Sequence, residues 1–158
     1  QRFAIASALV NNPVLLFLDE PTTGLDPEER IRIRNLLVDF GRDRSVLFSS
    51  HVVEDLASTC NDLCILKKGK KIYDGTIQHL ICEADNHVFS CMLSSEEEFL
   101  KVQEKYKITG KNYSNEGIDI RLVSKSVPDV TGIEFQYVKP TLEDAYIYKS
   151  SSEKFEEI

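Results

Sequence analysis

The sequence predicts an α/β fold with parallel strands joined by crossover helices, followed by a small α+β appendage. Short apolar runs at residues 14–18 and 45–50 each precede a helical pattern, and this alternation is typical of parallel strands with helical crossovers. Residues 14–18 also lack the apolar and polar alternation of a half-exposed strand, which predicts burial on both faces. The composition changes after about residue 83, where alternating strand patterns begin.

Helical patterns lie on either side of the first strand. Residues 1–10 place apolar side chains at helical spacing without an N-cap residue before them, so we expect the chain to begin inside a longer domain. Asp26 is predicted to cap the next helix, because Pro27 suits its first position and Glu29 completes a capping box. Residues 52–59 predict the helix that follows the second strand.

The rest of the chain predicts a hairpin and then the appendage. A lysine-rich, glycine-containing turn between two apolar runs indicates a hairpin over residues 61–76. The later patterns predict strands at 87–93, 117–123 and 133–138, a helix at 96–106, and a final helix begun by Pro140, Thr141 and Asp144. We therefore predict three parts: residues 1–82, an α+β accessory domain at 85–148, and a flexible acidic tail at 149–158.

The bulk composition excludes several classes of protein. With 42% hydrophobic and 28% charged residues among 158, the chain is predicted to be globular rather than disordered. A net charge of −7 argues against a general nucleic-acid binder, so no nucleic-acid partner is expected. No apolar run is long enough to cross a bilayer, and we expect a cytoplasmic chain.

Two adjacent carboxylates, Asp19 and Glu20, stand at the end of the first predicted strand. Ligands of open α/β sheets bind outside the carboxyl ends of parallel strands, which makes this pair a candidate site. Neighbouring strand residues point to opposite faces, so the two carboxylates are expected to do different jobs. One is suited to hold a metal ion while the other handles a proton.

The stretch "LLFLDEPTTGLDP", followed by "SSHVVEDL", resembles the ATP-binding subunits of ABC transporters. Three linked motifs of that family occur in order: an extended Walker B ending in the acid pair, a D-loop containing Asp26, and a switch histidine at His51. "QRFAIASALVNNP" is similar to the segment after the family's LSGGQ signature. The resemblance covers residues 1–82 and implies the C-terminal part of a P-loop NTPase domain.

The resemblance implies ATP and Mg²⁺ as cofactors and a role for each motif residue. Asp19 would hold a Mg²⁺ that keeps several of its own waters. Glu20 would be the general base that orients the attacking water, and His51 would donate a hydrogen bond to the γ-phosphate or the water. Asp26 would reach the partner subunit's site while still capping its helix. Gly24 is predicted to supply the backbone freedom of the turn.

Several family motifs are absent from the 158 residues. They contain no GxxxxGK[ST] loop, no Q-loop and no LSGGQ signature, so the backbone amides and lysine that cradle phosphates are missing. We therefore expect negligible ATP binding by these residues alone. The expected explanation is that the chain is the C-terminal portion of a longer ATPase.

The residues within the motifs favour a transporter over other ABC proteins. "EPTTGLDP" is similar to transporter ATPases, and "VKPTLEDAYIY" is similar to the "PSLEDVF" ending of ATPases that serve ABC-2-type exporters. This implies a second ATP-binding subunit arranged head to tail, transmembrane permease partners, and a place on the cytoplasmic face of the membrane. Two alternatives stay open: a soluble, non-transport ABC ATPase, and a non-enzymatic truncated chain with an interaction or regulatory role.

Overall fold

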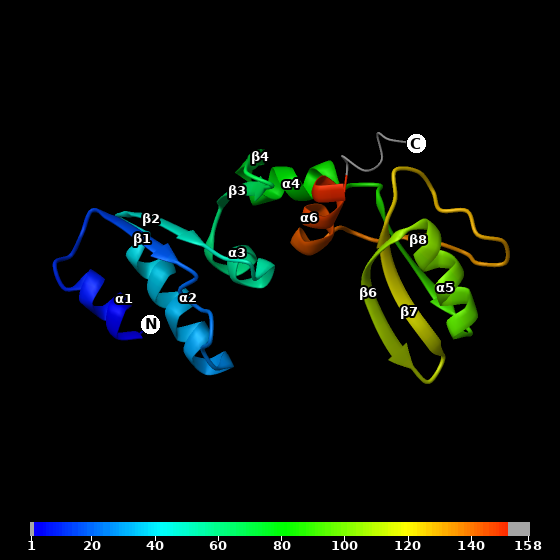
Figure 1. The fold of residues 1–158 in the computed structure, drawn as a ribbon, viewed down its shortest axis with the longest axis horizontal. Helices are drawn as coiled ribbons and strands as arrows, with labels where there is room; N and C mark the ends of the chain where they lie inside the picture. Colours follow the sequence, from blue (N-terminus) through cyan, green and yellow to red (C-terminus); the bar gives the residue numbers. More distant parts are fainter. Residues whose placement is uncertain (1, 152–158) are drawn as a thin grey trace. The chain divides into compact units, whose positions relative to one another are not determined.

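The computed structural model describes residues 2–151, and the chain divides into two compact units (Figure 1). Unit 1 is residues 1–61 and unit 2 is residues 62–158. The division therefore lies earlier in the chain than the boundary predicted from composition at residues 82–85. No helix within the described residues is long and apolar enough to span a membrane.

Residues 2–61 of unit 1 contain two strands and three helices. They follow one another as α1 (Arg2–Leu9), β1 (Leu15–Asp19), α2 (Pro27–Phe40), β2 (Ser45–Ser49) and α3 (Val53–Thr59). β1 and β2 pair in parallel, with Leu16 opposite Val46 and Asp19 opposite Ser49. The crossover between them is α2, because parallel neighbours cannot be joined by a tight turn.

The core of unit 1 lies between the strand pair and two helices. Leu16 is buried and belongs to one apolar cluster with Ile5 of α1 and with Ile33 and Leu37 of α2. Figure 1 shows α1 and α2 on the same side of β1 and β2. Burial of these side chains provides most of the driving force that holds the helices against the strands.

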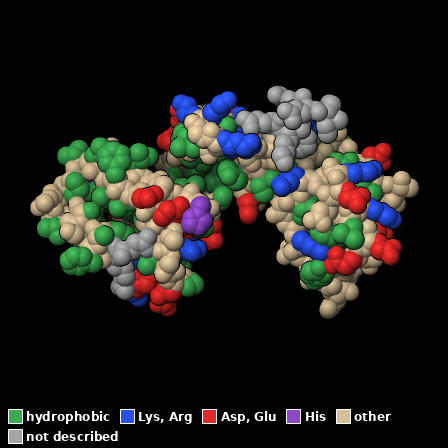
Figure 2. All heavy atoms as spheres, in the orientation of Figure 1, with side chains coloured by type: hydrophobic (Ala, Val, Ile, Leu, Met, Phe, Trp, Pro, Cys, Tyr) green, Lys and Arg blue, Asp and Glu red, His purple; other side chains and the backbone are tan. Residues whose placement is uncertain are grey.

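The opposite face of the strand pair is exposed. Leu15, Phe17 and Leu47 have exposed fractions of 48%, 65% and 61%, and hydrophobic side chains gather on this part of unit 1 in Figure 2. The prediction that residues 14–18 are buried on both faces is therefore wrong. Side chains alternate between the two faces of a strand, and in residues 2–151 the helices pack against only one of them.

As far as residue 151, unit 2 combines a hairpin, three helices and an antiparallel sheet. β3 (Asp62–Lys67) pairs with β4 (Lys70–Thr76), as predicted for a hairpin. The remaining strands form one sheet in the order β6-β7-β5-β8. The elements after the hairpin are α4 (Ile77–Glu83), β5 (Val88–Leu93), α5 (Glu96–Lys105), β6 (Lys107–Ser114), β7 (Gly117–Val123), β8 (Gln136–Tyr137) and α6 (Leu142–Ser151).

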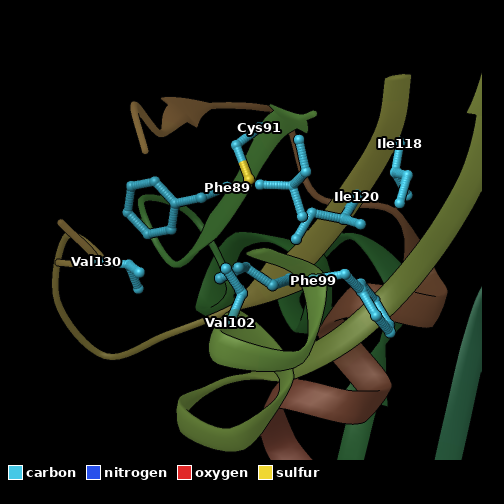
Figure 3. Packing of buried hydrophobic residues seen from close by; sticks show 9 residues of the cluster. Phe89, Cys91, Phe99, Val102, Ile118, Ile120 and Val130 are labelled. Atoms are coloured by element: carbon cyan, nitrogen blue, oxygen red, sulfur yellow. The ribbon is translucent and has the colours of Figure 1, made fainter. Parts of the chain in front are cut away.

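Helix α5 packs its apolar face on the sheet of unit 2. Phe99 and Val102 of α5 cluster with Phe89 and Cys91 of β5 and with Ile120 of β7 (Figure 3). Ser95 caps this helix, accepting a hydrogen bond from the Glu98 amide at 3.3 Å. The cluster is the core around which the appendage folds.

Three parts of unit 2 differ from the prediction. Strand β6 was not predicted, because its polar residues lack alternation and its pairing with β7 is what makes it a strand. The strand predicted at 133–138 is reduced to Gln136–Tyr137, the two residues that pair with β5. Residues 149–151, predicted as the start of the tail, continue α6; the rest of the predicted tail, residues 152–158, lies outside the described part.

Contacts made by α6 explain why α4 belongs to unit 2. Lys149 Nζ lies 2.6 Å from the Glu83 carboxylate at the end of α4. The Tyr148 ring stacks on His87, with 4.6 Å between ring centroids. These contacts tie residues at and just after the predicted boundary to the last helix. The domain boundary at residues 82–85, which composition indicated, remains a prediction.

Asp144 anchors α6 to the sheet. Its carboxylate accepts hydrogen bonds from Arg121 Nε at 2.8 Å, from Thr109 Oγ1 at 2.6 Å and from the Thr141 amide at 2.9 Å. The Asp144 amide donates to Thr141 Oγ1 at 3.2 Å, so the two residues form a reciprocal capping box. Burial opposes ionisation of Asp144, but the hydrogen bonds from Arg121, Thr109 and Thr141 outweigh it and hold its pKa below the ordinary 3.8.

Replacing Asp144 with asparagine is expected to lower the free energy of unfolding by about 2 kcal/mol at neutral pH, because charge-assisted hydrogen bonds are lost. A lowered carboxyl pKa stabilises the fold above the unfolded-state value, and this stability is lost as the pH falls through the folded-state pKa. The difference between Asp144→Asn and the unaltered protein should therefore shrink below the ordinary pKa of 3.8. Urea unfolding at several pH values measures it, with the exposed neighbour variant Glu143→Gln as control. A difference that does not change with pH would contradict this account.

Candidate functional site

The candidate site lies where β1 and β2 end in unit 1. Asp19 is the last residue of β1 and lies opposite Ser49, the last residue of β2. Glu20 follows β1 directly in the chain, and His51 follows β2 after Ser50. Because the strands are parallel, their carboxyl ends lie at one edge of the pair. The structure thus brings Asp19, Glu20 and His51 together, as their positions in the sequence predict.

Glu20 and His51 form a direct contact. His51 Nδ1 lies 2.8 Å from Glu20 Oε2, with side-chain exposed fractions of 69% for the histidine and 30% for the glutamate. Figure 2 shows a histidine beside acidic side chains on the surface of this unit. The hydrogen bond from His51 holds the pKa of Glu20 below its ordinary value, and the Thr23 hydroxyl adds to this effect. Glu20 is consequently ionised at neutral pH.

The backbone of Glu20 is in the left-handed region, with φ of 47°. A non-glycine residue there costs of order 1 kcal/mol. Local hydrogen bonds hold this conformation: the Thr23 amide donates to the Glu20 carbonyl at 3.2 Å, and Thr23 Oγ1 donates to Glu20 Oε2 at 3.0 Å. This turn directs the carboxylate toward His51 instead of continuing the strand.

Ser49 connects the two carboxylate residues, and sequence reasoning missed it. Its hydroxyl donates to Asp19 Oδ1 at 2.5 Å and accepts a hydrogen bond from the Glu20 amide at 3.0 Å. One side chain on β2 therefore fixes both the Asp19 carboxylate and the strained Glu20 backbone. The available signal was a serine at the end of the second apolar run, in a parallel strand that ends beside the acid pair.

The chemistry of Asp19 fits a magnesium ion. Its side chain is exposed at the strand end, and the described residues contain no group of three or more metal-ligating side chains. Mg²⁺ commonly binds one or two carboxylates together with substrate phosphates and its own waters, so it does not need a cage of protein ligands. A single carboxylate held by the Ser49 hydroxyl meets this requirement.

Asp26 lies further along the loop, at the start of α2. Its Oδ1 accepts a hydrogen bond from the Glu29 amide at 2.9 Å, which confirms the predicted N-cap. Gly24 has φ of +75°, and this confirms that the turn before Asp26 uses the freedom of a glycine. The cap explains the position of Asp26, whereas a role in a partner's site stays a prediction.

The comparisons with known proteins point to one class. No family model matches the chain. A Nod factor export ATP-binding protein I from Rhizobium meliloti is 32% identical over 162 residues, covering 93% of this chain and 46% of the relative. The protein of the same name from Burkholderia thailandensis is also 32% identical, covering 93% of this chain and 50% of the relative. The same-named protein of Rhizobium leguminosarum bv. viciae is 44% identical over 87 residues.

The fold and the site define a mixed α/β protein compatible with part of a P-loop NTPase, with an acid pair at the end of a parallel strand. These matches over 93% of the chain confirm the resemblance to the ATP-binding proteins of ABC transporters, of the ABC-2 exporter type. It spans about half the length of the curated relatives it matches.

Replacing Asp26 with alanine is expected to lower the free energy of unfolding by about 1 kcal/mol, because the Glu29 amide loses its acceptor. Asp26→Asn should change it by less than about 0.5 kcal/mol, since asparagine caps helices equally well. Urea unfolding of both variants tests the cap. Equal destabilisation by alanine and asparagine would show that the charge of Asp26 matters beyond capping.

Proposed function

We propose that unit 1 carries the magnesium-binding and water-activating residues of an ABC exporter ATPase. The observation that supports this best is the 2.8 Å contact between Glu20 and His51, beside the Ser49 hydroxyl that joins Glu20 to Asp19. ATP hydrolysis needs a metal site, a group that orients water, and hydrogen-bond donors for the charge that develops on the phosphate. The residues at this strand edge match those needs in type and in number.

Asp19 is the proposed metal ligand. Mg²⁺, when bound, neutralises phosphate charge and orients the phosphoryl oxygens. The Ser49 hydroxyl orients the Asp19 carboxylate by donating to Oδ1. This fixed orientation lowers the conformational entropy that metal binding would otherwise cost.

Glu20 is the proposed general base. It is ionised at neutral pH because the hydrogen bonds from His51 and Thr23 lower its pKa. An ionised carboxylate can accept a proton from water and orient its lone pair. The left-handed backbone held by Ser49 and Thr23 fixes where that carboxylate points. Orientation of water, rather than strong basicity, is the contribution this geometry favours.

His51 is the proposed hydrogen-bond donor at the γ-phosphate. In the structure its Nδ1 faces Glu20, so Nδ1 carries the proton of that hydrogen bond. A neutral imidazole in this tautomer can only accept at Nε2, whereas an imidazolium donates from both nitrogens. Donation from Nε2 to a phosphate oxygen therefore requires the charged ring.

The proposal also assigns partners and a place in the cell. Hydrolysis requires phosphate-binding groups that these 158 residues do not contain, because no GxxxxGK[ST] motif is present. The relatives are named for export and for ATP binding. By the resemblance to ABC transporter ATPases, we assign the protein a head-to-tail partner ATP-binding subunit, with Asp26 reaching that partner's site. Transmembrane permease subunits would hold the pair at the cytoplasmic face of the membrane.

Glu20→Gln in the intact protein is expected to reduce ATP turnover at least about 100-fold, the usual contribution of a positioned general base. Nucleotide affinity should change little, because glutamine keeps the size and hydrogen-bonding capacity of the side chain. Steady-state hydrolysis and equilibrium nucleotide binding measure the two effects. The matched control is Glu28→Gln, at a position whose side chain is 86% exposed on α2. Unchanged turnover in Glu20→Gln would remove Glu20 as the base.

A further inference from the structure

We propose that Asp55, together with Thr22 and Arg34, is a positioning network that holds the turn after Glu20 against the segment after His51. This inference deepens the proposed function and rests on it. Thr22 belongs to the turn between β1 and α2, Arg34 to α2, and Asp55 to the first turn of α3. None of the three is assigned to the chemistry above.

The centre of the network is a buried hydrogen bond. Thr22 Oγ1 donates to Asp55 Oδ2, and the two residues have exposed fractions of 2% and 0%. Thr22 follows Glu20 by two positions, and Asp55 follows His51 by four. The bond therefore joins the two chain segments that carry the site, and it is buried, whereas the His51 and Glu20 side chains are 69% and 30% exposed.

Arg34 brings helix α2 into the same network. Its Nη1 lies 3.7 Å from Asp55 Oδ1 and donates to Ser58 Oγ at 3.0 Å, and its side chain is only 14% exposed. Ser58 Oγ in turn donates to the Glu54 carbonyl at 2.9 Å in α3. One cation thus connects α2 with α3 at the point where Asp55 meets Thr22.

The free-energy cost of burying the Asp55 carboxylate indicates that this residue has a role other than stabilising the fold. A buried carboxylate is costly even when paired, and apolar residues of similar volume usually stabilise a fold as well or better. Asp55 Oδ1 is buried and has no hydrogen-bond partner among the described residues, with only the longer ion pair to Arg34. What this arrangement provides is a defined position of Thr22 relative to α3.

Backbone hydrogen bonds link Thr22 and Asp55 to the residues of the site. The Thr23 amide donates to the Glu20 carbonyl at 3.2 Å, and the Asp55 amide donates to the Val52 carbonyl at 3.1 Å. Each end of the Thr22–Asp55 bond is therefore one short turn from Glu20 or His51. A displacement of about 1 Å in such a site can cost about 100-fold in rate.

The test uses Thr22→Val and Asp55→Asn in the intact protein. Thr22→Val removes the hydroxyl at constant shape and should lower kcat for ATP hydrolysis by about tenfold or more, with KM changed by less than about threefold. Thr22→Ser keeps the hydroxyl and should restore kcat. The matched control is Glu28→Gln, which removes a carboxylate that is 86% exposed on α2 and contacts Arg32 rather than a residue of the network; it should leave kcat unchanged.

A double variant separates positioning from a merely structural role. If Thr22 acts through the Glu20–His51 pair, adding Thr22→Val to His51→Ala should lower kcat little further than His51→Ala does. If the double variant instead loses kcat by the product of the two single-variant factors, Thr22 and His51 act independently, and the proposal is overturned. So would a Thr22→Val protein that melts at a lower temperature but turns over normally while folded.

A second readout does not depend on hydrolysis. The ¹⁵N chemical shifts of the His51 ring report its contact with Glu20, and they should move in Thr22→Val and Asp55→Asn but not in Glu28→Gln. Unmoved shifts in the first two variants would overturn the positioning role. Moved shifts in a protein whose unaltered form does not hydrolyse ATP would instead contradict the proposed function and leave the network in place.

Discussion

The parallel register of β1 and β2 is the constraint on which the candidate site depends. It sets Asp19 opposite Ser49, so that one hydroxyl can bond the Asp19 carboxylate and the Glu20 amide. A shift of one residue would turn Ser49 to the other face and break both bonds. The same register brings His51 to the edge where Glu20 leaves the strand.

Much of this site follows from residues close together in the sequence. The acid pair after an apolar strand, the N-cap at Asp26 and the left-handed Gly24 are local features that their residue types specify. Ser49, and the bond between Thr22 and Asp55, depend instead on which residues two distant segments bring together. Local patterns carry no information about such pairs.

Exposure was the other feature that local patterns could not predict. A continuous apolar run predicts a strand that is buried on both faces. Phe17 is nevertheless 65% exposed, because the described helices pack on one side of the strands. Strand β6 shows the converse: its polar residues become a strand only through pairing with β7. In unit 2, the ending that resembles exporter ATPases has a structural role, since Thr141 and Asp144 cap α6 and Asp144 binds Arg121 of β7.

The most direct measurement is the effect of Mn²⁺–ATP on the ring signals of His51 in the intact protein, followed by NMR. Mn²⁺ is paramagnetic and accepts the oxygen ligands that suit Mg²⁺. Our account predicts strong broadening of the His51 signals when Mn²⁺–ATP binds. In Asp19→Asn, this broadening should be lost. Bound Mn²⁺–ATP that leaves the His51 signals sharp would contradict the claim that Asp19, Glu20 and His51 form one nucleotide-hydrolysing site.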